Sequence, residues 1–238
     1  MSLIHVGMRH RRQLAVLGSL VLATALCMAL VVARWAWTHQ ATHRWLLWNL
    51  FLAWLPAAAA LGAYNLRHRQ GLGARLAFGA LGVMWLGFWP NAPYLVTDLI
   101  HLRPAAEAPD WYDLLMYVTF AWTGFFLGLV SLYVMQAAVS RAFGALAGWA
   151  VSVGALALGG FGIYLGRFLR WNSWDVLTRP DALLSDIASR LLHPLADPRA
   201  TVFSILASLW LGAMYLMLVA VSRLRAEDVV EVHQPLGR

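Results

Sequence analysis

Asp98 and His101 are the two residues in this sequence whose types and spacing best suit chemistry. They lie three positions apart in FWPNAPYLVTDLIHL, residues 88–102, so on a helix they share one face. A carboxylate beside an imidazole suits general acid–base catalysis, or two ligands of a divalent metal ion. A carboxylate that only fixes a histidine at the end of an apolar segment would explain the pair equally well. We therefore treat both as candidate catalytic residues, with that structural role as the alternative.

Two prolines interrupt the chain just before this pair. Pro90 and Pro93 remove backbone donors and break a helix, so Asn91 and the freed carbonyl groups are expected to face a cavity. Tyr94 follows directly and would help to shape that cavity. Asn91 and Tyr94 are therefore candidate ligand-binding residues.

A second polar cluster, GRFLRWNSWD at residues 166–175, combines arginine with tryptophan at helical spacing. Arginine recognises carboxylate or phosphate through a planar fork, and tryptophan offers a flat stacking surface. Together they suit an anionic head group, a sugar, or an internal salt bridge to Asp98 or Asp113, and the salt bridge is the simpler interpretation. The candidate ligand-binding residues of this cluster are Arg167, Arg170, Trp171, Asn172 and Asp175.

Asp110 and Asp113 flank an aromatic pair at the start of a later apolar segment. Acidic residues at the amino end of a helix complement the helix dipole, which accounts well for Asp110. Asp113 lies deeper in the segment, so we keep it as a further candidate ligand-binding residue.

The composition excludes an ordinary soluble domain. Of the 238 residues, 61% are hydrophobic and 12% are charged, whereas soluble domains carry roughly a quarter charged residues. Several apolar runs reach the roughly 20 residues that cross a bilayer, so we expect an integral membrane protein. The net charge is +7, but the arginines lie between apolar runs, which indicates membrane orientation rather than nucleic-acid binding. The chain has no lysine, which excludes a retinal Schiff base, and its single cysteine excludes an intramolecular disulfide.

The elements that must position these residues are helices. Hydropathy predicts an all-α fold, a polytopic membrane bundle of six transmembrane helices plus a short interfacial helix. The expected spans are 14–33, 45–64, 75–96, 112–137, 143–166 and 200–222, with the interfacial helix at about 181–193. Residues 1–13 would form a cytoplasmic N-terminal segment, residues 14–222 the membrane domain, and residues 223–238 a cytoplasmic C-terminal tail.

The placement of arginine predicts that both termini are cytoplasmic. Short loops on that side carry several arginines and no acidic residue, whereas the opposite loops mix arginine with aspartate. This orientation gathers the polar clusters and eight of the thirteen tryptophans at the outer face. An aromatic belt alone would explain tryptophans at both faces, so the bias toward one face favours a built site.

Four segments of the chain resemble an uncharacterised bacterial membrane-protein family, catalogued as domain of unknown function 1361. The resemblance covers roughly Arg44 to Ser222. It implies a multi-pass protein of the bacterial inner membrane and implies no established activity. The segments that carry it are WNLFLAWLP at Trp48–Pro56, FWPNAPYLVTDLIHL at Phe88–Leu102, WYDLLMYVTFAWTG at Trp111–Gly124 and GRFLRWNSWD at Gly166–Asp175.

The sequence thus predicts a polar and aromatic site, open to the extracytoplasmic side, that binds a lipid head group, a lipid-linked sugar or a small anion. The main alternative is a metal-dependent membrane hydrolase or transferase, in which Asp98, His101 and Asp175 hold a divalent metal ion. A transporter comes third, because it needs a polar path to the cytoplasmic side and the inner halves of the spans carry almost no charge. A structural or assembly role is the remaining alternative. The sequence names neither a cofactor nor an oligomeric state.

Overall fold

The structure is a computed structural model, and it describes residues 3–66, 69, 71–102, 108–171 and 175–223. These residues form helices and no strand, so the predicted all-α fold is confirmed for the described part of the chain. The helices are α1 (Leu3–Thr38), α2 (Arg44–Leu66), α3 (Leu72–Phe88), α4 (Asn91–Tyr94), the 3-10 helix η1 (Leu95–His101), α5 (Asp110–Phe143), α6 (Ala145–Phe168), α7 (Asp175–Thr178), α8 (Pro180–Leu192) and α9 (Pro198–Arg223).

Six of the described segments are long and apolar enough to cross a membrane, as predicted. They are Leu14–Thr38, Arg44–Leu66, Leu72–His101, Asp110–Phe143, Ala145–Phe168 and Pro198–Arg223. The chain is therefore a multi-pass membrane protein. The largest differences from the predicted boundaries are at three carboxyl ends: the first span continues to Thr38, the third continues past Val96 to His101, and α5 extends to Phe143. The chain turns only at Gly144, whose φ of 95° is one that glycine adopts without the steric cost of a side chain.

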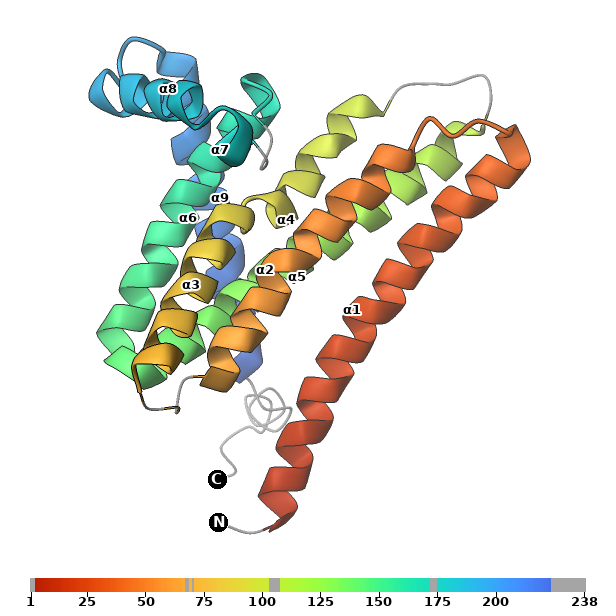
Figure 1. Cartoon of the computed structure of the whole chain (residues 1–238). Coiled ribbons are helices and arrows are strands. Elements are labelled where there is room, and N and C mark those ends of the chain that lie inside the picture. Colours follow the sequence, from red (N-terminus) through yellow and green to blue (C-terminus); the bar gives the residue numbers. More distant parts are fainter. Residues whose placement is uncertain (1–2, 67–68, 70, 103–107, 172–174, 224–238) are drawn as a thin grey trace, which may run out of the picture.

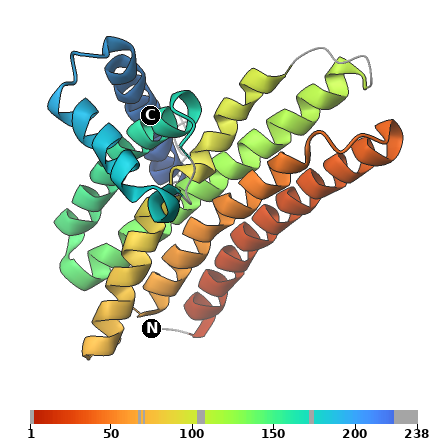
Figure 2. The same ribbon diagram turned by 45° about the horizontal axis from the view of Figure 1, so that its top comes forward.

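The spans pack around α5. It contacts α1, α2 and α6, while α2 also packs on α3 and α6 packs on α9 (Figure 1). The helix α1 runs along one side of the bundle, and α8 lies across the end of the bundle, outside the spans (Figures 1 and 2). The structure thus has a separate short helix where the sequence predicts an interfacial one at 181–193.

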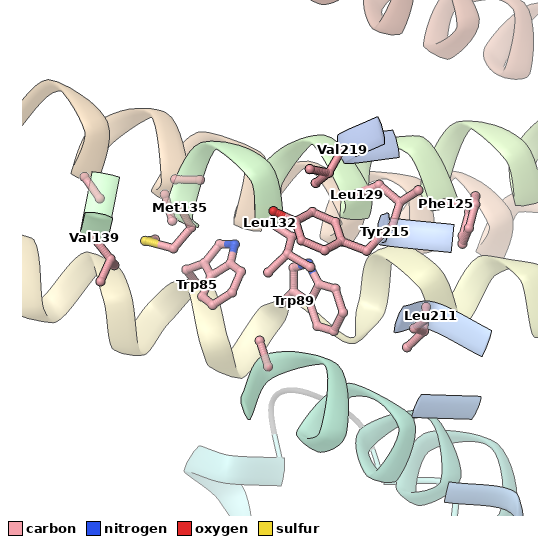
Figure 3. Packing of buried hydrophobic residues seen from close by; sticks show 14 of the residues in the cluster. Trp85, Trp89, Phe125, Leu129, Leu132, Met135, Val139, Leu211, Tyr215 and Val219 are labelled. Atoms are coloured by element: carbon pink, nitrogen blue, oxygen red, sulfur yellow. The ribbon is translucent and has the colours of Figure 1, made fainter. Parts of the chain in front are cut away.

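Large aromatic side chains fill the centre of the bundle. Trp85 of α3 and Trp89, which directly follows α3, pack against Leu132 of α5 and Tyr215 of α9, and all four are at most 1% exposed (Figure 3). The indole Nε1 of Trp89 donates to the backbone oxygen of Gly128 at 2.9 Å. Trp89 therefore anchors the carboxyl end of α3 to α5, and this fixes where the following prolines begin.

After Trp89 the third span bends at its two prolines and continues as α4 and η1. This segment seats against α5 where α5 has glycine. A Cβ on Gly124 would lie 2.8 Å from the backbone oxygen of Ala92, and one on Gly128 would lie 3.1 Å from Pro93. Because the bent segment approaches so closely, its polar end is held in one position.

Candidate functional site

The carboxylate of Asp98 is buried at the centre of the candidate site. It lies on η1 and is only 2% exposed. Its Oδ1 accepts from Nη2 of Arg167 on α6 at 2.5 Å, and its Oδ2 accepts from the side-chain amide of Asn49 on α2 at 3.0 Å. Three helices that are distant in sequence therefore meet at one carboxylate, and the predicted salt bridge between the two clusters is present.

Arg167 organises the rest of the site. Its Nε and Nη2 donate to the hydroxyl of Thr97 at 3.0 and 2.7 Å, and its guanidinium lies 4.6 Å from the centre of the Tyr94 ring. Its Nη1 lies 2.8 Å from Nε2 of His101. An arginine can only donate, so Nε2 of His101 is the acceptor in this contact. Within the described residues these bonds use four of the five guanidinium hydrogens, and one hydrogen on Nη1 is left for a further acceptor.

A cavity of about 580 Å³ opens beside this group. That volume falls within the roughly 300–1,000 Å³ typical of small-ligand sites. Its apolar wall includes Leu52, Gly87, Pro90, Gly162 and Leu165. The polar and aromatic residues that line it are Trp48, Asn49, Asn91, Tyr94, His101, Arg167, Arg170 and Trp171.

Arg170 reaches this cavity through an unusual backbone conformation. It follows the end of α6 with φ 59°, in the left-handed region that a residue with a side chain rarely adopts. The backbone amide of Trp171 donates to the oxygen of Leu165 at 3.2 Å, which turns the chain back over the end of the helix. Within the described part of the chain, the exposed Arg170 side chain forms no ion pair.

Asp113, a further candidate ligand-binding residue, contacts a different arginine. It pairs with Arg34 of α1, with Nε to Oδ1 at 2.7 Å and Nη2 to Oδ2 at 3.1 Å. Both residues are buried, with exposed fractions of 4% and 1%. The physical reason is that α1 packs on α5 and brings Arg34 to the first turn of that helix.

Asp175 makes its described side-chain contacts with Thr178 and Arg179, not with the group around Asp98. It is buried at the start of α7 and accepts from Arg179 at 3.0 Å, one turn later in the chain. The guanidinium of Arg179 in turn lies 5.1 Å from the centre of the Trp171 ring, so Asp175 supports the cavity wall indirectly. The remaining candidate of that cluster, Asn172, lies outside the described residues.

A metal centre would need a third ligand beside Asp98 and His101. In the part of the chain that the structure describes, no three His, Cys, Asp or Glu side chains are close enough to hold one ion. Arg167 instead bonds to both residues and places a positive charge where the cation would sit. The geometry favours an anion over a cation at this place.

Two residues of the site were missed by sequence reasoning. Asn49 and Thr97 contact the charged pair directly, but neither stands out as a candidate by type alone. An amide in an otherwise apolar span is costly unless it has a partner, and this signal could have identified Asn49. Thr97 has no such signal, because threonine satisfies its own hydroxyl within a helix; here it also donates to the oxygen of Tyr94.

One family model matches this chain, over residues 48–219, and its description is "Protein of unknown function (DUF1361)". The match covers Asn49, Asp98 and Arg167, and it begins after Arg34. No curated protein and no solved structure matches the chain.

Proposed function

The chain belongs to the DUF1361 family of proteins of unknown function, and from that premise we propose that it is a membrane protein whose outer-end cavity binds an anionic head group or a small anion. The observation that carries the proposal is Arg170, a cation held on the cavity wall with no acidic partner among the described residues. A positive charge of this kind is favourable where an anion can enter.

The charges around the cavity support this. Arg167 is balanced by Asp98, whereas Arg170 on the cavity wall has no acidic partner in the described part of the chain. The remaining Nη1 hydrogen of Arg167 provides a second donor. Two guanidinium groups from one helix end suit the oxygens of a phosphate or carboxylate, and Trp48 and Trp171 supply flat surfaces for an attached sugar or glycerol.

The backbone of Arg170 supports a binding role as well. A non-glycine residue in the left-handed region costs of order 1–3 kcal/mol and persists where surrounding structure requires it. Glycine is the residue favoured just beyond a helix end in this conformation. An arginine in this place brings its charge to the cavity at a cost in stability, which a purely structural turn would not need.

The test uses protein purified in a neutral detergent and sn-glycerol 3-phosphate as the probe, measured by isothermal titration calorimetry. We expect saturable binding that Arg170→Gln weakens by about tenfold, because a hydrogen bond to a charged group is lost. Arg199→Gln is the matched control, since Arg199 is exposed near the start of α9 and does not line the cavity. Equal affinity in the wild type and Arg170→Gln, or no binding by the wild type, would sink the proposal.

We also propose that the protein resides in a bacterial inner membrane, with both termini cytoplasmic. The arginine distribution supports this orientation, and three arginines of the opposite face, Arg34, Arg167 and Arg179, are bound to aspartates. Fusions of alkaline phosphatase and of green fluorescent protein to the C-terminus test it. Only the fluorescent fusion should be active, and an active phosphatase would reverse the orientation.

A further inference from the structure

The cavity has a polar part and an apolar part, so its ligand should have both as well. We propose that its occupant is an amphiphile: a lipid with an anionic head group at Arg167 and Arg170 and a hydrocarbon chain that extends between α2, α3 and α6. This inference rests on the proposed anion site and narrows it from any anion to a lipid.

The cavity extends from the end of the spans into their apolar part. Its polar residues His101 and Arg167 lie at the ends of the third and fifth spans. Leu52 lies eight residues inside the second span, which corresponds to about 12 Å along a helix. The hydrocarbon core of a bilayer is about 30 Å thick, so this depth is most of one leaflet. A soluble anion would have no use for that apolar extension.

Two glycines, Gly87 and Gly162, line the apolar part of the cavity that lies within the spans. Gly87 lines it and is exposed near the middle of the third span, where an exposed surface meets lipid rather than water. A Cβ on Gly87 would meet no atom within 4 Å. Opposite, Gly162 lies so close to the bend that its Cβ would stand 2.9 Å from Pro90. The cavity therefore opens toward the bilayer beside Gly87.

The polar and apolar parts belong to one continuous cavity. Leu165 and Arg167 lie on the same helix, two positions apart, and both line it. The two ends of an amphiphile require this order: charge at the membrane surface and apolar contact below it. A volume of about 580 Å³ holds a head group and the first part of one chain, and the rest of the chain can leave beside Gly87 into the bilayer.

The experiment compares two probes that share a head group, dioleoyl phosphatidic acid and sn-glycerol 3-phosphate. Binding to the purified full chain is measured by native mass spectrometry for the lipid and by calorimetry for the soluble probe. Gly87→Leu is designed to fill the apolar part of the cavity, because a Cβ at this position meets no atom within 4 Å. Gly79→Leu is the control, because a Cβ on Gly79 also meets open space on the same helix but Gly79 does not line the cavity.

We expect the wild type to bind the lipid at least tenfold more tightly than glycerol phosphate, since each buried methylene adds to affinity. Gly87→Leu should weaken lipid binding by about tenfold and leave glycerol phosphate binding unchanged, and Gly79→Leu should alter neither. Gly87→Val, with a smaller side chain, should have a smaller effect in the same direction and replaces Gly87→Leu if that variant does not fold.

The outcomes separate the two proposals. Equal affinity for lipid and glycerol phosphate, with no effect of either Gly87 variant, overturns the lipid inference and leaves the anion site standing. If the lipid binds but Arg170→Gln changes the affinity of neither probe, Arg170 does not hold the head group. This result overturns both the proposed anion site and the lipid inference that rests on it.

Discussion

Two buried arginine–aspartate pairs hold this bundle together, and they differ in what surrounds them. Arg34 grips both oxygens of Asp113 with its planar fork, and the two side chains are 2% and 5% exposed. Arg167 binds only one oxygen of Asp98, is 11% exposed, and lines the larger cavity. We call the first the closed pair and the second the open pair.

The closed pair has the geometry of a structural link. Arg34 also reaches the hydroxyl of Thr42 at 3.5 Å, and the hollow beside it is smaller, about 260 Å³. It ties α1 to α5, so it joins a helix that precedes the family match to one inside it. The open pair instead shares its arginine among an aspartate, a threonine and a histidine. Burial of a charge pair alone therefore does not mark a site. What distinguishes Arg167 is that several side chains share its guanidinium on the wall of a cavity of ligand size, about 580 Å³.

The largest effect on stability is expected from a substitution in the closed pair. Asp113→Ala leaves a buried guanidinium without its carboxylate, and breaking such a pair costs about 3–5 kcal/mol. Thermal unfolding in detergent should show a large loss of stability, with no specific effect on glycerol phosphate affinity in the folded fraction. The double variant Arg34→Met with Asp113→Leu should recover most of the loss. A stable Asp113→Ala protein would contradict the structural role.

At the open pair we expect a smaller loss of stability and, unlike at the closed pair, a gain in affinity for glycerol phosphate. Asp98→Asn removes a charge but keeps an acceptor, so we expect a loss of about 1–3 kcal/mol. Because Arg167 then lacks its counter-charge, the affinity for glycerol phosphate should rise several-fold. Calorimetry on Asp98→Asn and Asp113→Asn measures this side by side. A fall in affinity at Asp98→Asn would show that the carboxylate itself contacts the ligand.

Arg170 offers a test in which stability and binding should move in opposite directions. Arg170→Gly relieves the left-handed backbone at φ 59° and should stabilise the protein by about 1 kcal/mol. The same change should weaken glycerol phosphate binding, as Arg170→Gln does. Unfolding temperature and calorimetry are measured on both variants. If Arg170→Gly lowers stability, the arginine side chain stabilises the fold, and its left-handed backbone is then no sign of a binding role.

The smallest effect on stability is expected at Asp197, a carboxylate that is only partly buried, which shows how much burial matters in the two pairs. The backbone amide of Ala200 and the hydroxyl of Tyr164 donate to Asp197 and hold its pKa below the usual value. A lowered folded-state pKa stabilises the protein above the unfolded pKa of about 3.9, and this contribution is lost as the pH falls through the folded pKa. The stability difference between the wild type and Asp197→Asn should thus be present at pH 6 and vanish in acid. If the stability difference between the wild type and Asp197→Asn were the same at both pH values, the charge of Asp197 would not contribute to stability.

Much of the fold follows from local patterns in the sequence. Apolar runs of sufficient length predict the spans, because crossing a bilayer requires internally bonded helices whatever their neighbours are. The prolines at 90 and 93 likewise predict the interruption of the third span, since the loss of backbone donors is a local property. For the same reason the types of Asp98, His101, Arg167 and Arg170 indicate their chemistry without knowledge of their partners.

Which arginine pairs with which aspartate depends on how the helices pack in the tertiary structure. Asp98 bonds to Arg167, 69 positions away, and Asp113 bonds to Arg34, 79 positions away, although either arginine could pair with either aspartate by type. In a membrane protein both the lipid-facing and the packed sides of a helix are apolar, so the sequence does not state which helices are neighbours. Helix packing therefore places the closed pair between α1 and α5, where it links them, and places Arg167 of the open pair on the wall of the cavity.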